Sequence, residues 1–230
     1  MRLKQEDKID IIVMAAIKEL IKDDDIFIDF IQILSDVNLY SHILAVAKFS
    51  VALALEYDFN KKDLISIAKG GLLHDTGKLF IDRNILYKPG RFTDAEYELV
   101  KQHPKLGYEH IKDKTDNKFI LGAIKQHHER IDSKGYPDGI EEKELYIQII
   151  TVSDIFSALT EARVYKKAMY ASKAFEILEG DSGVNQDIVQ ALKGVVFDEY
   201  EIYFRAKKLA KYYRQYFKEK HDYSFDFEEG

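Results

Sequence analysis

The chain has 230 residues, of which 46% are hydrophobic, and its 34 basic and 40 acidic residues give a formal net charge of −6. This length fits one large domain, or a medium domain with terminal additions, and the apolar content is sufficient for a substantial core. The acidic balance argues against general affinity for nucleic acid polymers or anionic membranes, although a local basic pocket for a phosphate ligand stays open. Because the sequence contains no cysteine, disulfides and thiolate metal sites are excluded, and any metal must be bound by His, Asp or Glu.

The N-terminal region gives no sign of a targeting segment. The apolar run 11–17 is the only signal-peptide candidate, but three acidic residues precede it, Glu6, Asp7 and Asp10. No stretch approaches the roughly 20 uncharged residues that span a bilayer. We therefore expect a cytoplasmic protein.

Apolar residues recur at three- and four-residue steps along most of the chain, which predicts an all-α fold. In the segment 42–57, for example, Val46, Phe49 and Leu53 follow this spacing. The segment 146–152 is rich enough in β-branched residues to be ambiguous, but its length and continuation favour a helix. The predicted helices cover 7–21, 26–35, 42–57, 61–75, 93–112, 117–129, 144–161, 172–179, 186–192 and 195–219.

Local signals mark one helix start and one interruption. Thr93 followed by Glu96 is a capping-box pattern, which predicts that a helix begins here. Pro104 falls inside the predicted helix 93–112, where a proline ends or kinks a helix.

We expect three parts: an N-terminal helical lead over 1–35, a central helical bundle over 36–192 and a C-terminal helical extension over 193–230. Aromatic and basic residues alternate over 200–220, which is typical either of a nucleic-acid platform or of an amphipathic helix packed on the domain or on a second subunit. Acidic residues dilute the basic face and favour the helix, whose packing residues would be Phe204, Leu209, Tyr212 and Tyr216.

Histidines and aspartates form the most informative pattern in the sequence. Six of the seven histidines lie between 42 and 128. Asp154 stands among apolar neighbours and needs a buried positive partner, as does the pair His74-Asp75. A single helical histidine is usually structural, and we interpret His110 and His221 in that way. The remaining residues suit iron, manganese or zinc, although composition alone leaves metal binding and structural roles equally open: His42, His74, Asp75, His103, His127, His128 and Asp154.

The order His42, His74-Asp75, Asp154 resembles that of the HD phosphohydrolases. Further motifs, spread with it over about residues 36–192, resemble the HD-GYP subfamily of these enzymes. The resemblance implies an HD-domain helical bundle, a binuclear metal centre and hydrolysis of a cyclic dinucleotide, with cyclic di-GMP as the expected substrate. The motifs are His74-Asp75-Thr76-Gly77-Lys78, Ile85-Leu86-Tyr87-Lys88-Pro89-Gly90, His103-Pro104-Lys105-Leu106-Gly107, His127-His128-Glu129-Arg130-Ile131-Asp132-Ser133-Lys134-Gly135-Tyr136-Pro137 and Ala158-Leu159-Thr160-Glu161-Ala162-Arg163-Val164-Tyr165-Lys166-Lys167-Ala168.

The resemblance also assigns roles. One divalent metal, iron or manganese, is expected on His42, His74, Asp75 and Asp154, and a second on Asp75, His103, His127 and His128. Asp75 would bridge the two ions, which together activate a water molecule for attack on phosphorus. Asp75 and Lys78 are thus the expected catalytic residues, and Lys78 would also contact the substrate phosphate. Arg163 and Lys166 are expected to contact guanine or phosphate, with ordinary surface salt bridges as the alternative.

Three positions depart from the family pattern. Ser133 replaces the first glycine of Asp-Gly-x-Gly-Tyr-Pro and would be strained if this position requires a positive φ. Ser157 stands before Ala158-Leu159, where an acidic residue is common. Asn38 stands where relatives with a third metal have glutamate, so we expect two metals.

Two other functions stay open: an HD hydrolase of another nucleotide, such as cyclic GMP-AMP, and a non-catalytic adaptor that binds a cyclic dinucleotide. The GYP-type loop and the pair Arg163 and Lys166 favour a cyclic diester substrate. The complete set of ligands argues against the adaptor. A homodimer or a signalling partner protein also stays open.

Overall fold

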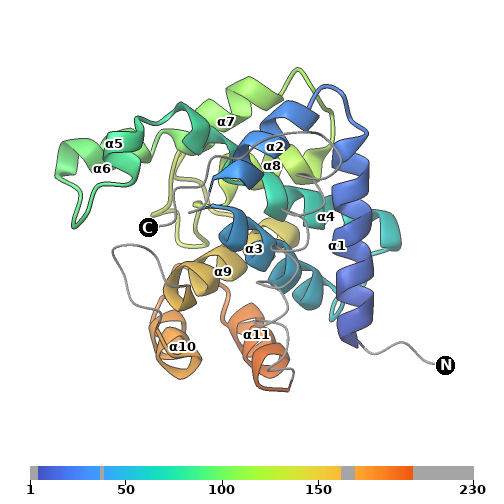
Figure 1. Cartoon of the computed structure of the whole chain (residues 1–230). Helices are drawn as coiled ribbons and strands as arrows, with labels where there is room; N and C mark the ends of the chain where they lie inside the picture. The colour runs from blue at the N-terminus through green and yellow to red at the C-terminus, as the bar shows by residue number, and fades with distance from the viewer. Residues whose placement is uncertain (1–4, 37–38, 162–168, 199–230) are drawn as a thin grey trace.

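The structure is a computed structural model that describes residues 5–36, 39–161 and 169–198. The described residues form helices without a strand; one isolated bridge joins Arg130 and Glu141. The prediction of an all-α fold is therefore confirmed (Figure 1). The α-helices are Gln5–Ile21 (α1), Phe27–Ser35 (α2), Tyr40–Ala54 (α3), Lys61–Leu73 (α4), Arg83–Leu86 (α5), Asp94–Val100 (α6), His103–Ile111 (α7), Lys118–Gln126 (α8), Leu145–Thr160 (α9), Ala171–Glu179 (α10) and Gln186–Asp198 (α11), and a 3-10 helix, η1, covers Thr76–Phe80.

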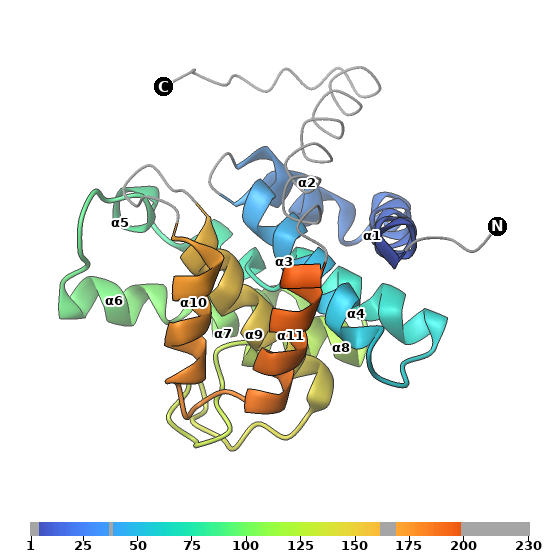
Figure 2. The ribbon, with the colours of Figure 1, turned by 90° about the horizontal axis from the view of Figure 1, so that it is seen from below.

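Helix α3 is the centre of the bundle. Every residue from His42 to Ala54 is buried, so this helix needs neighbours on all of its sides. Helices α1, α4, α9 and α11 provide them, as the two ribbon views show (Figures 1 and 2). Lys48 on α3 is buried too, and its ammonium lies 2.6 Å from a carboxylate oxygen of Asp10 on α1.

The N-terminal helix shares the core of the rest of the chain. A single cluster of buried apolar side chains extends from Ile9 on α1 to Val195 on α11. Helix α1 packs against α4 and α3. The division at residues 35 and 36 stays a prediction, and most of the predicted C-terminal extension, including residues 200–220, lies outside the described residues.

The predicted helix over 93–112 is wrong as one element, because the structure divides it into α6 and α7. The capping box is present: Thr93 Oγ1 accepts the N–H of Glu96, and the Glu96 carboxylate accepts the N–H of Thr93. Pro104 lies in the first turn of α7, where its missing N–H leaves no hydrogen bond unmade. The proline therefore lies at the start of α7 and does not kink a continuous helix. Near the C-terminal end, α11 continues through residues 193 and 194, where a break was predicted.

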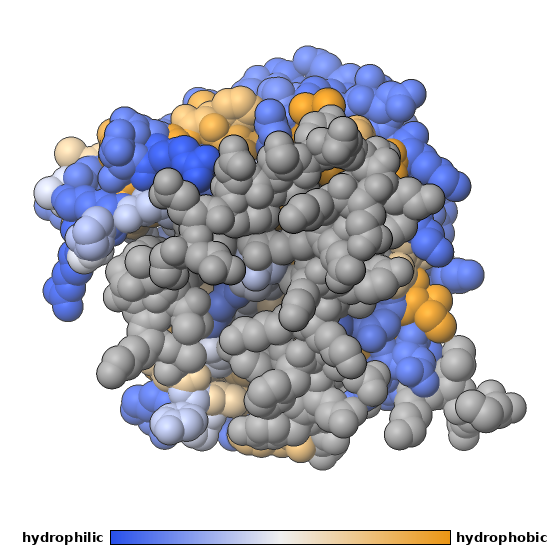
Figure 3. All heavy atoms as spheres, in the orientation of Figure 1, coloured by the Kyte–Doolittle hydropathy of each residue, from blue (hydrophilic) through white to orange (hydrophobic). Residues whose placement is uncertain are grey.

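The face seen in Figure 1 presents mostly hydrophilic residues where the described part of the chain forms the surface (Figure 3). Within the described ranges, no single helix is long and apolar enough to cross a membrane. Helices α2 and α3 meet the length and composition criterion only as a pair, across a bend of 114°.

Candidate metal centre

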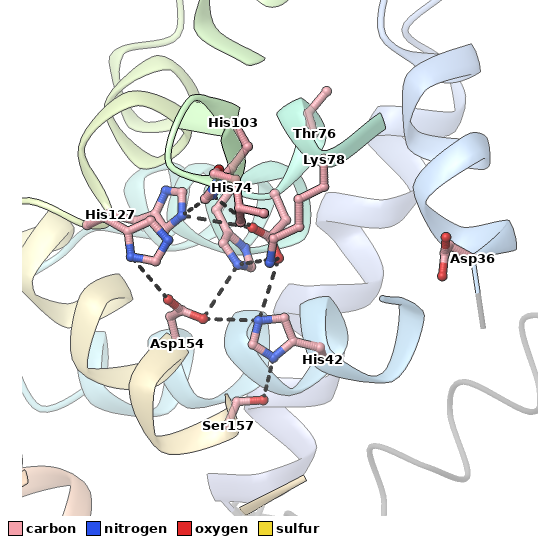
Figure 4. Close-up of polar contacts among 12 residues, drawn as sticks. Asp36, His42, His74, Thr76, Lys78, His103, His127, Asp154 and Ser157 are labelled. Carbon is pink, nitrogen blue, oxygen red and sulfur yellow. Dashed lines mark hydrogen bonds and ion pairs between the residues drawn. The ribbon is translucent and has the colours of Figure 1, made fainter. Parts of the chain in front are cut away.

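The seven predicted ligands come together at one place inside the bundle (Figure 4). Each comes from a helix or a helix end: His42 from the first turn of α3, His74 and Asp75 from the end of α4, His103 from the start of α7, His127 and His128 from the end of α8, and Asp154 from the middle of α9. Six of them are buried, and the side chain of His128 is 21% exposed. The fold therefore gathers residues that lie up to 112 positions apart in the sequence.

Asp75 lies between two groups of histidines. Its Oδ2 atom is 3.7 Å from Nε2 of His42 and 3.4 Å from Nε2 of His74. Its Oδ1 atom is 3.4 Å from Nε2 of His103 and 3.9 Å from Nε2 of His127. The two carboxylate oxygens thus face different pairs of imidazoles.

Asp154 closes the site from the side of α9. Its Oδ1 atom is 3.0 Å from Nε2 of His42 and 3.8 Å from Nε2 of His74, and its Oδ2 atom is 4.0 Å from Nδ1 of His128. An ionised carboxylate in this apolar part of α9 requires positive charge nearby. The arrangement supplies nitrogen donors and places a second carboxylate, Asp75, in the same centre.

The donor atoms fit divalent cations. Nε2 of His74 and Oδ1 of Asp75 are buried without a hydrogen-bond partner. Such orphaned atoms are costly, and a cation bound by both groups would remove that cost. A donor set of imidazoles and carboxylates suits first-row transition metals. Three overlapping groups have donor atoms within 4.8 Å of one another: His42, His74 and Asp75; His74, His127 and Asp154; and His103, His127 and His128.

Backbone carbonyls fix the outer nitrogens of three histidines. Nδ1 of His74, His103 and His127 each donates to a carbonyl oxygen about one helical turn earlier, at 2.8, 2.8 and 2.7 Å, on Gly71, Val100 and Ala123 respectively. With the proton held on Nδ1, the lone pair of Nε2 points into the centre.

The charge states also favour cations. Burial lowers the pKa of His103 to about 4 and that of His127 to about 3, so both imidazoles are neutral near pH 7 and available as ligands. Burial opposes ionisation of Asp75, but the positive charge of Lys78 and the neighbouring His74 hold its pKa well below the usual range. Burial likewise opposes ionisation of Asp154, whose pKa is lowered by its hydrogen bond and charge interaction with His42. The centre thus combines ionised carboxylates with neutral imidazoles at His103 and His127. At the buried His74, desolvation opposes a positive charge, but the charges of Asp75 and Asp154 raise the pKa.

The 3-10 helix η1 places Lys78 in the centre. Its ammonium lies 2.5 Å from Oδ2 of Asp75, so a positive charge already accompanies this carboxylate. Gly77 allows η1 to pack directly on α7, because a Cβ atom at this position would lie 1.7 Å from the carbonyl oxygen of His103. The glycine therefore brings Lys78 and Asp75 next to His103.

The loop after His128 touches the centre through an aromatic ring. Tyr136 stacks on His128 with ring centroids 4.5 Å apart and an interplanar angle of 27°. The Glu129 carboxylate accepts three N–H groups of the loop, at 2.6, 3.1 and 3.1 Å, from residues 138, 139 and 140. Ser133 has a φ of 61°, so the condition under which the sequence implies strain at this position is met. Glu129 thus orients the loop, and the loop orients a predicted ligand.

Several residues that the sequence singled out lie outside the metal centre or outside the described residues. Arg163 and Lys166, the predicted substrate contacts, and Asn38 lie outside the described residues, so their roles stay predictions. His110 lies away from the centre, and its Nε2 atom is 2.8 Å from a carboxylate oxygen of Asp29 on α2. Glu161, for which no role was predicted, is buried and lies 3.7 Å from Nδ1 of His42. Glu161 lies directly after the last residue of α9, Thr160, and its extended backbone departs from the helical spacing that Asp154 follows.

Comparison with known proteins is consistent with this geometry. The family model for the HD domain matches residues 29–187, which is more than half of the chain. The chain belongs to the HD-domain family. Among solved structures, this HD-domain chain is similar to Bd1817, an HDG"Y"P protein from Bdellovibrio bacteriovorus, with a TM-score of 0.61 and 20% identity over 84% of this chain and 72% of that one. The predicted HD-type helical bundle is therefore confirmed.

Curated relatives of this HD-domain chain are phosphodiesterases. It is 35% identical to the cyclic di-GMP phosphodiesterase PA4108 of Pseudomonas aeruginosa over 61% of this chain and 34% of that protein. It is 33% identical to the 3'3'-cGAMP-specific phosphodiesterase 3 of Vibrio cholerae over 69% of this chain and 36% of that protein. Together with the structural neighbour, these relatives confirm the HD-GYP resemblance. The chain spans between about a third and a half of the length of the first curated relatives that it matches.

Proposed function

We propose that this chain is a metal-dependent phosphodiesterase that hydrolyses a cyclic dinucleotide, with cyclic di-GMP as the substrate. The observation that carries the proposal is the position of Asp75, whose two oxygens face two different pairs of histidines. A carboxylate placed in this way is suited to bridge two cations. The cyclic di-GMP and cGAMP phosphodiesterases among the relatives support the substrate class.

The residues divide naturally between two iron or manganese ions. His42, His74, Asp75 and Asp154 would hold the first ion, and Asp75, His103, His127 and His128 would hold the second. His74 and His127 approach both groups, so the two sites are contiguous. When bound, the ions supply the positive charge that lowers the pKa of a water molecule and offsets the charge of a phosphodiester.

Side chains of the protein contribute the remaining functions. Lys78 lies at the centre with a positive charge that would contact a non-bridging phosphate oxygen. Arg163 and Lys166 would bind the guanine edge or a phosphate of the substrate, since a guanidinium matches paired acceptors. Burial of the ligands keeps bulk water away from the centre and strengthens each of these charge interactions. These residues belong to the proposed catalytic part, residues 36–192.

Anaerobic incubation with Fe²⁺ or Mn²⁺ tests the proposal. Cyclic di-GMP, cyclic GMP-AMP and cyclic di-AMP are supplied separately, and the products are separated by chromatography. We expect metal-dependent conversion of cyclic di-GMP to a linear or mononucleotide product. Faster conversion of cyclic GMP-AMP would instead favour the alternative that the Vibrio cholerae relative suggests. Binding of all three without conversion would contradict the enzyme and favour an adaptor.

A further inference from the structure

His42 differs from the other buried histidines of the centre in how its outer nitrogen is held. For His74, His103 and His127 the acceptor is a carbonyl oxygen of the preceding helical turn. His42 is only the third residue of α3, and its Nδ1 atom faces side chains of another helix, α9. Because these partners are side chains, they can be changed by substitution.

Two buried side chains, one on α9 and one directly after its last residue, lie near Nδ1 of His42. Ser157 Oγ lies 2.9 Å from this nitrogen, and Oε2 of Glu161 lies 3.7 Å from it. Figure 4 draws the contact between His42 and Ser157 as a dashed line. The other oxygen of Glu161 accepts the hydroxyl of Ser41, the residue before His42. Glu161 therefore connects the end of α9 to the start of α3 beside the metal centre.

The same face of α9 reaches both sides of the His42 ring. Asp154 and Ser157 lie three residues apart on one face of α9, and Glu161 follows directly after the last residue of this helix, Thr160. Asp154 meets Nε2 at 3.0 Å, whereas Ser157 and Glu161 meet Nδ1. One helix thus holds the inner and the outer nitrogen of this imidazole.

One carboxylate oxygen of Glu161 lacks a hydrogen-bond donor. The Oε2 atom is buried and has no hydrogen-bond partner. A buried carboxylate oxygen is stabilised by a nearby N–H dipole or positive charge, and a proton on Nδ1 of His42 would supply one. That tautomer leaves the lone pair on Nε2, which faces Asp75 and Asp154.

We propose that Ser157 and Glu161 are positioning residues that keep the proton of His42 on Nδ1 and direct Nε2 to the first metal ion. The inference rests on the proposed metal centre and concerns how tightly that centre binds its ion. A carboxylate behind a metal-bound histidine fixes the ring and makes it a stronger donor, and its loss typically weakens metal binding about 10- to 100-fold.

The test is a calorimetric titration of the full chain with Mn²⁺, comparing Glu161→Gln with the wild type. We expect the dissociation constant of one Mn²⁺ ion to rise by about tenfold or more, while the ion on the side of His103 and His128 binds as before. The melting temperature of the metal-free protein should not change, which separates positioning from a general loss of packing. Glu176→Gln is the matched control, because Glu176 is exposed on α10 and bonded by Lys173.

A carboxylate at position 157 should restore the Mn²⁺ affinity that Glu161→Gln loses. In Glu161→Gln, the added change Ser157→Asp returns a carboxylate beside Nδ1 of His42, and we expect Mn²⁺ affinity to recover to within about threefold of the wild type. If Glu161→Gln does not fold, Ser157→Ala removes the 2.9 Å contact and should weaken one Mn²⁺ site in the same manner. Equal Mn²⁺ affinity in wild type, Glu161→Gln and Glu176→Gln would overturn the inference. A wild type that binds no Mn²⁺ would overturn the proposed centre itself.

Discussion

At the scale of single residues, Asp75 and Lys78 are in contact in the metal centre but have different proposed roles. Asp75 is buried, and its two carboxylate oxygens face four histidines of the centre, His42, His74, His103 and His127. Lys78 contacts Asp75 as a hydrogen-bond donor, and an ammonium group has no lone pair with which to bind a cation. Its charge is available to an anionic substrate. The two side chains should therefore separate metal binding from turnover.

We predict that Asp75→Ala abolishes both metal loading and hydrolysis, since it removes the carboxylate that both ions share. Lys78→Ala should keep two ions and lower the turnover number by one to two orders of magnitude, roughly the loss of one charged contact worth about 1.5–3 kcal/mol. Elemental analysis and steady-state kinetics on both variants measure the difference. Loss of metal from Lys78→Ala as severe as that from Asp75→Ala would contradict these roles.

Ser133 has the positive φ that the sequence pattern named as the condition for backbone strain. An exposed serine with a φ of 61° adopts a left-handed conformation that glycine accepts without steric conflict. We predict that Ser133→Gly raises the free energy of unfolding by about 0.5–1 kcal/mol. Ser182→Gly is the control, because Ser182 is an exposed loop serine without positive φ, and there glycine should destabilise the protein. Urea denaturation measures both, and equal effects would refute the strain.

At the scale of elements, apolar periodicity predicted the long helices well and the short ones poorly. Helices α1, α4, α8 and α9 lie within one or two residues of most predicted bounds, because each buries a stripe of regularly spaced side chains. Helix η1 and helix α5 are too short to establish a period and were not predicted. The start of α7 depends on Pro104. A proline can end a helix, kink it or stand in its first turn, and the sequence alone does not distinguish these cases.

For the candidate site, the sequence predicted the metal-ligand residues but not all of the contacts around them. The metal-ligand candidates follow from histidines and aspartates in apolar surroundings and from the family pattern, and the structure brings all seven together. The contacts that Tyr136 and Glu161 make with these candidates were not predicted. Tyr136 and Glu161 reach His128 and His42 through side-chain directions and helix packing, which no spacing in a single sequence determines.

The contact between η1 and α7 depends on a single glycine, which can be tested. Gly77→Ala should destabilise the fold by about 1–3 kcal/mol, because its Cβ would meet the backbone of His103, which cannot rotate away. It should also weaken metal binding at His103. Gly194→Ala is the matched control: nothing lies within 4 Å of its Cβ, and alanine inside α11 should stabilise the protein by about 0.5–1 kcal/mol. Thermal unfolding measures both variants. A melting temperature that rises in Gly77→Ala, or one that falls in Gly194→Ala, would contradict the prediction.

At the scale of the whole molecule, the metal centre connects helices that the chain joins only through distant loops. The proposed ligands come from the ends of α4 and α8, the starts of α3 and α7 and the middle of α9. The same helices form the hydrophobic core. Binding of a cation should therefore favour the folded bundle as a unit, since an unfolded chain does not hold these residues together.

We predict that removing the metals lowers the melting temperature of the whole protein. One ion present at a hundredfold excess over its dissociation constant stabilises the native state by about 2.7 kcal/mol, and a domain of this size shifts by roughly 2–4 °C for each kcal/mol. Loading with Mn²⁺ after chelation should therefore raise the melting temperature by about 5–10 °C for each ion bound. His110→Ala, which lies outside the centre, should show the full shift. Asp75→Ala should show little of it, and a full Mn²⁺-dependent shift in that variant would mean that the ions bind elsewhere.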